Sequence, residues 1–170
     1  MKTKPLTFLL ALTFLFLFWG SVYGQEGVEK LYWDNGQVRL EEHYKDGKEN
    51  GPWTRWHENG RKETEGLYKD GKKEGLETWW RRNGMKSMEG QYKAGEPEGL
   101  WITWDEYGRK STEIHNKDGK REGLATWWYR NGKKLMEKHY KNGKENGLWT
   151  EWSEDGKKTF QGTFKDGNEQ

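Results

Sequence analysis

Histidine is the residue type in this 170-residue chain whose spacing first suggests metal chemistry. His43, His115 and His139 fall at one position of a 24-residue period, and His57 stands outside it. In a sheet of consecutive strands, positions 24 residues apart would lie two strands apart, at about 9.6 Å. Zinc holds imidazole nitrogens at about 2.0–2.1 Å. We therefore expect no metal site at these histidines, and we predict no cofactor.

Glutamates recur with the same period at positions Glu41, Glu65, Glu89, Glu113 and Glu137. Carboxylates at such separations resemble the pair of an inverting glycosidase. However, a residue that recurs in nearly every unit is more typical of a structural role. We expect these glutamates to face Lys and Arg side chains of neighbouring strands. The chain also has no cysteine, nucleophile elbow, phosphate loop or zinc motif. We predict that it is not an enzyme.

Lysines recur just before the turns, at Lys45, Lys69, Lys93, Lys117, Lys141 and Lys165. Such a column could bind a polyanion. However, the 30 basic and 28 acidic residues nearly cancel, and Lys2 and Lys4 account for the excess. This balance excludes a strongly basic nucleic-acid-binding protein. The lysines therefore indicate solvated turns.

The elements that carry these columns form one repeat of 24 residues, copied six times without a break in register. We place the units at approximately 28–51, 52–75, 76–99, 100–123, 124–147 and 148–170, within a repeat array that spans 25–170. The recurring glycines are Gly47, Gly71, Gly95, Gly119 and Gly143. The recurring aromatics are Trp56, Trp80, Trp104, Trp128, Trp152, Tyr44, Tyr68, Tyr92 and Tyr140. Asn116 interrupts the tyrosine column.

Each unit predicts two short strands and two tight turns. One turn carries Asn-Gly, as at Asn35-Gly36, for which we expect a type I′ turn with positive φ at both central residues. The other carries Asp-Gly, as at Asp46-Gly47. Connections this short join antiparallel neighbours. We predict an all-β fold, an elongated single-layer antiparallel meander of about six β-hairpin repeats and twelve strands.

Strand alternation predicts two different faces. One face repeats Leu or Pro, then Thr or Ile, then Trp. The other face varies with a 48-residue period and carries the candidate binding residues, Trp53, Trp79, Trp101, Trp127 and Trp149. These rings could stack on sugars, bind a protein or the membrane interface, or pack on one another. Gly66, Gly90 and Gly162 lie in mid-strand, where we expect each to leave a flat floor for an indole ring.

Residues 1–24 predict a cleaved secretory signal. Lys2 and Lys4 precede an apolar run of fourteen residues, and Val22 and Gly24 occupy the −3 and −1 positions. An uncleaved membrane anchor is the alternative, but a spanning helix needs about 20 apolar residues. We expect cleavage near Gly24 and export to the periplasm, cell envelope or extracellular space.

Written as G-x-Y-K-D-G-K-x-x-G-x-W, the units resemble the MORN repeat, and more closely its bacterial variant. The matching residues in the second and third units are Gly66, Tyr68, Gly71, Gly75, Gly90, Tyr92, Gly95 and Gly99. The resemblance implies an elongated single-layer array of β-hairpins. Bacterial proteins of this type are often labelled as antitoxins of the YwqK family.

Three functions remain open. The first is an exported, non-enzymatic binding or scaffold module whose partner is another protein. The second is a protein that binds an envelope glycan or a lipid head group through the tryptophans. The third is a cytosolic antitoxin that neutralises a toxin protein. No nucleic-acid partner is expected. The exposed edge strands leave end-to-end association open.

Overall fold

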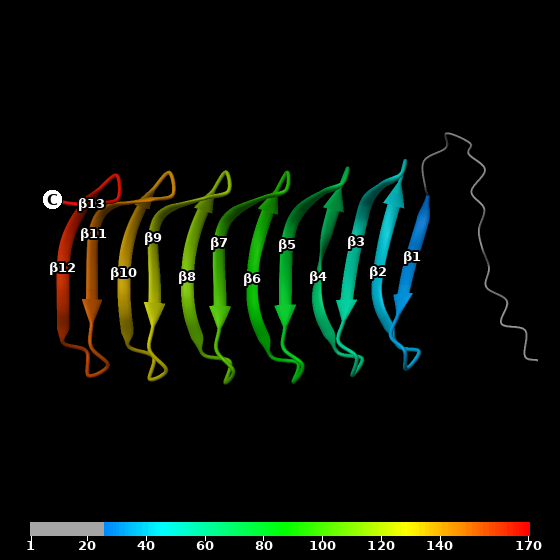
Figure 1. Ribbon diagram of the computed structural model, residues 1–170, viewed down its shortest axis with the longest axis horizontal. Coiled ribbons are helices and arrows are strands. Elements are labelled where there is room, and N and C mark those ends of the chain that lie inside the picture. The colour runs from blue at the N-terminus through cyan, green and yellow to red at the C-terminus, as the bar shows by residue number, and fades with distance from the viewer. Residues whose placement is uncertain (1–25) are drawn as a thin grey trace, which may run out of the picture.

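The computed structural model describes residues 26–170 as strands and turns in one open sheet (Figure 1). The predicted signal segment lies outside the described residues. Every strand is hydrogen-bonded to its neighbours in the chain, in the order β1 to β13. Over the described residues we find no helix that is long and apolar enough to cross a membrane.

The sheet confirms the predicted antiparallel meander, with thirteen strands rather than twelve, because Asn168–Glu169 adds a short last one. The strands are β1 (Gly27–Tyr32), β2 (Val38–Lys45), β3 (Lys48–Trp56), β4 (Lys62–Lys69), β5 (Lys72–Trp80), β6 (Lys86–Lys93), β7 (Glu96–Trp104), β8 (Lys110–Lys117), β9 (Lys120–Trp128), β10 (Lys134–Lys141), β11 (Lys144–Trp152), β12 (Lys158–Lys165) and β13 (Asn168–Glu169).

The Asp-Gly turns form as the sequence predicts. Asp46 has φ 51° and Gly47 has φ 74°, so both central residues are left-handed, as a type I′ turn requires. Ala94 takes the same conformation with φ 51°, although alanine has no side-chain oxygen to favour it. Each later turn of this type is also tied to the preceding hairpin. For example, the Gly71 N–H donates to the Glu49 carbonyl at 2.8 Å.

The Asn-Gly turns differ from the prediction, because only the glycine has a positive φ, 83° at Gly36. The Gly36 N–H donates to the Trp33 carbonyl and the Trp33 N–H to the Gln37 carbonyl, at 2.9 and 2.8 Å. This is a type I turn closed by a glycine bulge. The Asn35 side chain accepts from the Gln37 N–H at 3.0 Å and donates to the Glu58 carbonyl of the next hairpin at 2.9 Å. Asn35 therefore closes its own turn and bridges two hairpins.

A β-bulge follows each of these turns. Between β3 and β4, Arg55 pairs with Thr64 and Trp56 pairs with Lys62, so Glu63 is an extra residue. The same shift occurs at the corresponding place in every later hairpin. An extra residue on one strand bends that strand and increases its twist.

A second irregularity marks the third glycine column of the repeat. Gly75 has φ 70° and lies where the register jumps from Glu65–Thr78 to Leu67–Glu74. Equivalent jumps occur where β3, β7, β9 and β11 pair with the strand before them. The bowed strands of Figure 1 are the result expected of two bulges per unit.

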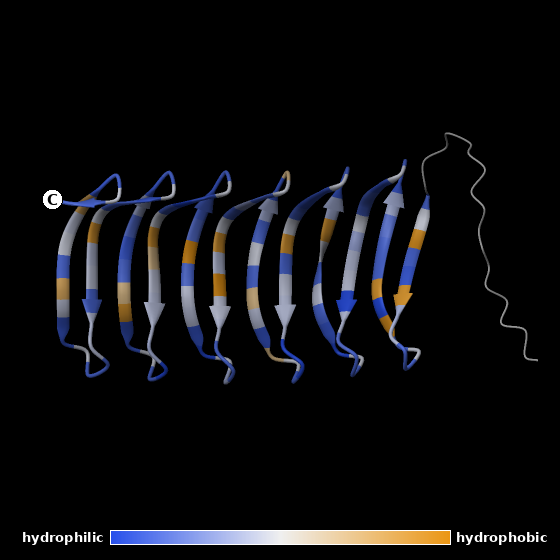
Figure 2. Cartoon of the chain, in the orientation of Figure 1, coloured by the Kyte–Doolittle hydropathy of each residue, from blue (hydrophilic) through white to orange (hydrophobic). Residues whose placement is uncertain are grey.

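Very little of the sheet is buried, and Figure 2 shows only scattered apolar positions on a largely hydrophilic chain. The buried apolar residues are Trp53, Ala125 and Tyr140, all on one face. On the opposite face the buried positions are hydroxyl side chains, Thr78, Thr126 and Thr150. Cohesion in this single layer thus comes mainly from contacts along each face.

Candidate binding face

The register places the five candidate tryptophans on one side of the sheet, which we call the tryptophan face: Trp53, Trp79, Trp101, Trp127 and Trp149. The tyrosine column lies on the same face. The other side carries Leu76, Leu100, Leu124 and Leu148 and is called the leucine face. Trp53 is buried, and the other four tryptophans are half-buried. Whether they contact a partner stays a prediction.

The rings of the tryptophan face pack mainly on one another. Trp53 lies 5.8 Å from Tyr68 between ring centroids, and Trp149 lies 4.9 Å from Phe164. Trp101 instead lies 5.6 Å from Trp79. It also meets Tyr92 edge-on at 5.2 Å. These tilted and edge-on contacts are favourable arrangements for aromatic pairs.

Two of the three mid-strand glycines act as the predicted floors. A Cβ added at Gly66 would lie 2.8 Å from Nε1 of Trp53, and one added at Gly90 would overlap the ring of Trp101. For Gly162 the prediction is wrong, because the nearest atom to an added Cβ is Cζ of Phe160, at 2.7 Å. Phe160 itself packs against the indole of Trp149, so the glycine supports that ring indirectly.

Cations cover several of these rings. Lys73 Nζ lies 5.3 Å from the Trp53 ring centroid and 4.9 Å from that of Tyr92, and it forms a 2.8 Å ion pair with Glu77. Lys138 Nζ lies 3.3 Å from the Trp149 ring. Such contacts are favourable because the ring faces carry negative charge. Burial raises the pKa of Glu77, and the hydrogen bond from Lys73 opposes this increase only in part.

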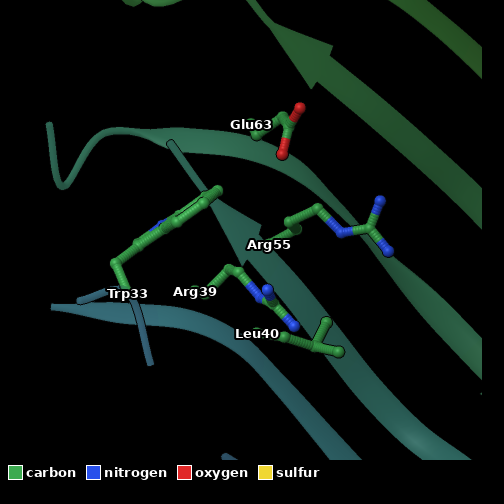
Figure 3. A pocket seen from close by; sticks show the side chains of 5 residues that line it. All are labelled: Trp33, Arg39, Leu40, Arg55 and Glu63. Atoms are coloured by element: carbon green, nitrogen blue, oxygen red, sulfur yellow. The ribbon is translucent and has the colours of Figure 1, made fainter. Parts of the chain in front are cut away.

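The tryptophan face is hollowed near its amino-terminal end, where Trp33, Arg39, Leu40, Arg55 and Glu63 surround a depression of about 290 Å³ (Figure 3). Arg39 lies over the Trp33 ring, 5.5 Å from its centroid. Within residues 26–170, neither arginine forms an ion pair. This hollow therefore offers two arginines without an ion pair, beside the Trp33 indole, whose N–H is bonded to the Trp56 carbonyl.

The leucine face carries the repeated glutamates, which the sequence predicts to pair with cations of neighbouring strands. Glu41 does so, 2.8 Å from Lys30 of β1. In later units the prediction is wrong, since the partner precedes the glutamate by three residues in the same strand, as in the 2.6 Å pair of Lys110 and Glu113. The bulge residue between them turns both side chains to one face. Lys110 Nζ also lies 5.3 Å from the Trp128 ring, so the pair ties one hairpin to the next.

Histidines on the leucine face bind the backbone. Nδ1 of His43 lies 2.7 Å from the Pro52 carbonyl, and Nδ1 of His139 lies 3.0 Å from the Leu148 carbonyl. His115 makes a longer contact of the same kind. No group of three His, Asp or Glu side chains able to hold a metal ion occurs in residues 26–170.

Sequence reasoning missed one structural column because its residue type varies. The position that opens each Asn-Gly turn donates a side-chain hydrogen bond to the carbonyl of a repeated tryptophan in the next unit. The donors are Trp33, His57, Arg81 and Tyr129, at 2.7 to 3.1 Å. These four residues are of different types and share only a side-chain hydrogen-bond donor, so a search for recurring residue types does not find the position. A similar link joins Glu74 to the Ala94 N–H at 2.8 Å.

Comparison with protein families finds a match to the MORN repeat variant at residues 25–46, 49–70, 121–142 and 145–166. These segments cover the first two and last two hairpins, together just over half of the 170 residues. A comparison with curated proteins found no match. Each matched segment contains the bulge described above at the same position. The chain belongs to the MORN repeat variant family.

Proposed function

We propose that this chain is an exported, non-enzymatic repeat protein that binds another protein through the tryptophan face. Membership of a family of binding repeats supports a binding or scaffold module rather than a catalytic one. The observation that most supports a binding role is that the two faces differ in how regularly their residues repeat. The leucine face repeats the same ion pairs of lysine with glutamate and a column of buried threonines, whereas the tryptophan face changes from unit to unit and contains hollows with arginines that form no ion pair.

A protein partner fits this face better than a sugar. Sugar stacking needs exposed, flat ring faces, but here the indoles are tilted against one another or covered by lysine. Trp, Tyr and Arg are the side chains that contribute most at protein interfaces. Both arginines of the hollow in Figure 3 are exposed and free to pair with carboxylates of a partner.

Export is part of the proposal and is supported by the sequence of residues 1–24. Mass spectrometry of the native protein tests it directly. A mature chain that begins at Gln25 agrees with export, whereas a chain that retains residues 1–24 favours the cytosolic antitoxin alternative.

The binding surface is tested by crosslinking in the native envelope fraction with two variants that each place a carboxylate on one face. Arg55→Glu on the tryptophan face should abolish crosslinks to a protein partner. Leu76→Glu on the leucine face, where the side chain is 52% exposed, should leave them intact. The proposal fails if only Leu76→Glu removes the crosslinks. It also fails if the wild-type protein binds purified envelope polysaccharide or liposomes and no protein.

A further inference from the structure

The fourth hairpin breaks the pattern of the tryptophan face at two positions. Trp53, Trp101 and Trp149 occupy the same position of the repeat. In two of these three units, the residue thirteen places after the tryptophan is glycine, and the residue fifteen places after it is aromatic. This holds for Trp53 with Gly66 and Tyr68, and for Trp149 with Gly162 and Phe164. After Trp101 the corresponding residues are Ile114 and Asn116. Both lie within 71–120, the part of the array that the family comparison does not match.

These two substitutions change where the Trp101 ring lies. Trp101 is directly opposite Ile114, whose side chain replaces the glycine floor found opposite Trp53. The ring turns instead onto Gly90 of the preceding hairpin, and its N–H donates to the Gln91 carbonyl at 3.2 Å. The side of Trp101 that an aromatic ring covers in the other two units is left without one.

A hollow of about 240 Å³ lies at this place. Its lining is largely apolar and includes Trp101, Ile114, Pro97 and Met88, with Asn116 and Arg121 at the polar end. A cavity of about 150 Å³ is enough to hold a benzene molecule. The hollow is therefore large enough for one aromatic ring together with part of the chain that carries it.

The polar end selects for negative charge. Arg121 donates to the Tyr140 hydroxyl at 3.2 Å and forms no ion pair within the described residues. The Asn116 amide has no hydrogen-bond partner in the same part of the chain. A carboxylate beside the bound ring would satisfy both donors, and an arginine fork suits such a group.

From this geometry we propose that the hollow receives an aromatic side chain of a protein partner, next to a carboxylate of the same partner. The ring takes the place that Tyr68 and Phe164 occupy in their own units. This inference rests on the proposed function and specifies where on the tryptophan face a partner is anchored.

N-acetyl-L-phenylalanine, which has one ring and one carboxylate, is the probe for this site in NMR titrations of the purified chain. It should shift the Ile114 methyl and Trp101 indole N–H signals, with a dissociation constant of roughly 1 mM, as expected for so small a ligand. Asn116→Tyr restores the repeat and supplies the missing ring internally. It should reduce the affinity at least tenfold without lowering the melting temperature. Arg121→Gln should weaken binding of the acid and leave that of N-acetyl-L-phenylalanine amide unchanged.

Equal affinity of the Asn116→Tyr variant and the wild type, or shifts outside the hollow only, would overturn the inference. The crosslinking experiment separates it from the proposed function. If Asn116→Tyr crosslinks to the partner as the wild type does, the anchor is wrong and the binding function stands. If the probe occupies the hollow and no protein crosslinks to the wild type, the ring site stands and the proposed protein-binding function fails.

Discussion

Gly90 is required for a different reason from the glycines of the turns. The backbone there has no positive φ, so conformation alone would tolerate another residue. What excludes a side chain is the indole of Trp101, which lies directly on the Cα. Close contact between an aromatic ring and the backbone of a glycine takes the place of the aliphatic packing that this sequence lacks.

Gly90→Ala should therefore lower the free energy of unfolding by about 1–3 kcal/mol, the usual cost of overpacking. Urea denaturation with tryptophan fluorescence measures the change. The control is the same substitution in a Trp101→Ala background, where the added methyl group has room and the loss should largely disappear. An equal loss in both backgrounds would show that the contact with the ring is not the cause.

The buried carboxyl of Glu77 predicts a pH effect. Because burial raises its pKa in the folded state, the protein loses stability as the pH rises from the unfolded-state pKa through the folded-state pKa. Glu77→Gln removes this loss. The variant should match the wild type below about pH 4, where the carboxyl is protonated in both states, and be more stable at pH 7. Urea midpoints across this range provide the measurement, and a less stable variant at pH 7 would contradict the assignment.

At the level of strands and turns, each 24-residue unit contains one type I′ turn, one type I turn with its glycine bulge, and two register shifts between strands. Ala94 is the weak point of this design, since it holds a left-handed conformation that five other units assign to Asp or Asn. Left-handed geometry costs an ordinary L-residue about 1–2 kcal/mol.

Ala94→Gly should raise the free energy of unfolding by about 0.5–1 kcal/mol, because glycine relieves the strain while losing more backbone entropy on folding. Thermal or urea unfolding would detect this gain. Ala125→Gly is the matched control, since Ala125 is a buried strand residue with no positive φ, and its replacement should destabilise. A loss of stability in Ala94→Gly would argue against strain at the turn.

The sequence predicts the meander, the Asp-Gly turns and the division into two faces, because strand alternation and turn chemistry act locally. It does not predict the bulges, since a register shift depends on the partner strand. For this reason the lysine partners of the repeated glutamates, three residues away, are misassigned. The sequence also does not reveal the position of Trp33, His57 and Arg81, because three different side chains there donate the same kind of hydrogen bond to a backbone carbonyl of the next unit. Of the residues that line the hollow beside Asn116, only Trp101 is a candidate predicted from the sequence, because the hollow depends on the orientation of its ring.

At the scale of the whole molecule, the hairpins stabilise one another. A single layer has no second sheet to cover it, and each unit completes its packing with bonds to the next, such as Asn59 to the Arg82 carbonyl at 2.9 Å. Arrays of this kind behave as nearest-neighbour chains in which one unit alone is unstable. The backbone entropy of 24 residues, about 1–2 kcal/mol each, exceeds what one buried tryptophan contributes.

The most direct test is urea unfolding, followed by circular dichroism, of chains that contain one, two, three or all six hairpins. We expect β-sheet spectra for the longer chains, a urea midpoint that rises with each added hairpin, and no cooperative transition for one hairpin. A lone 24-residue unit that unfolds cooperatively, or a full chain with a helical or coil spectrum, would contradict it.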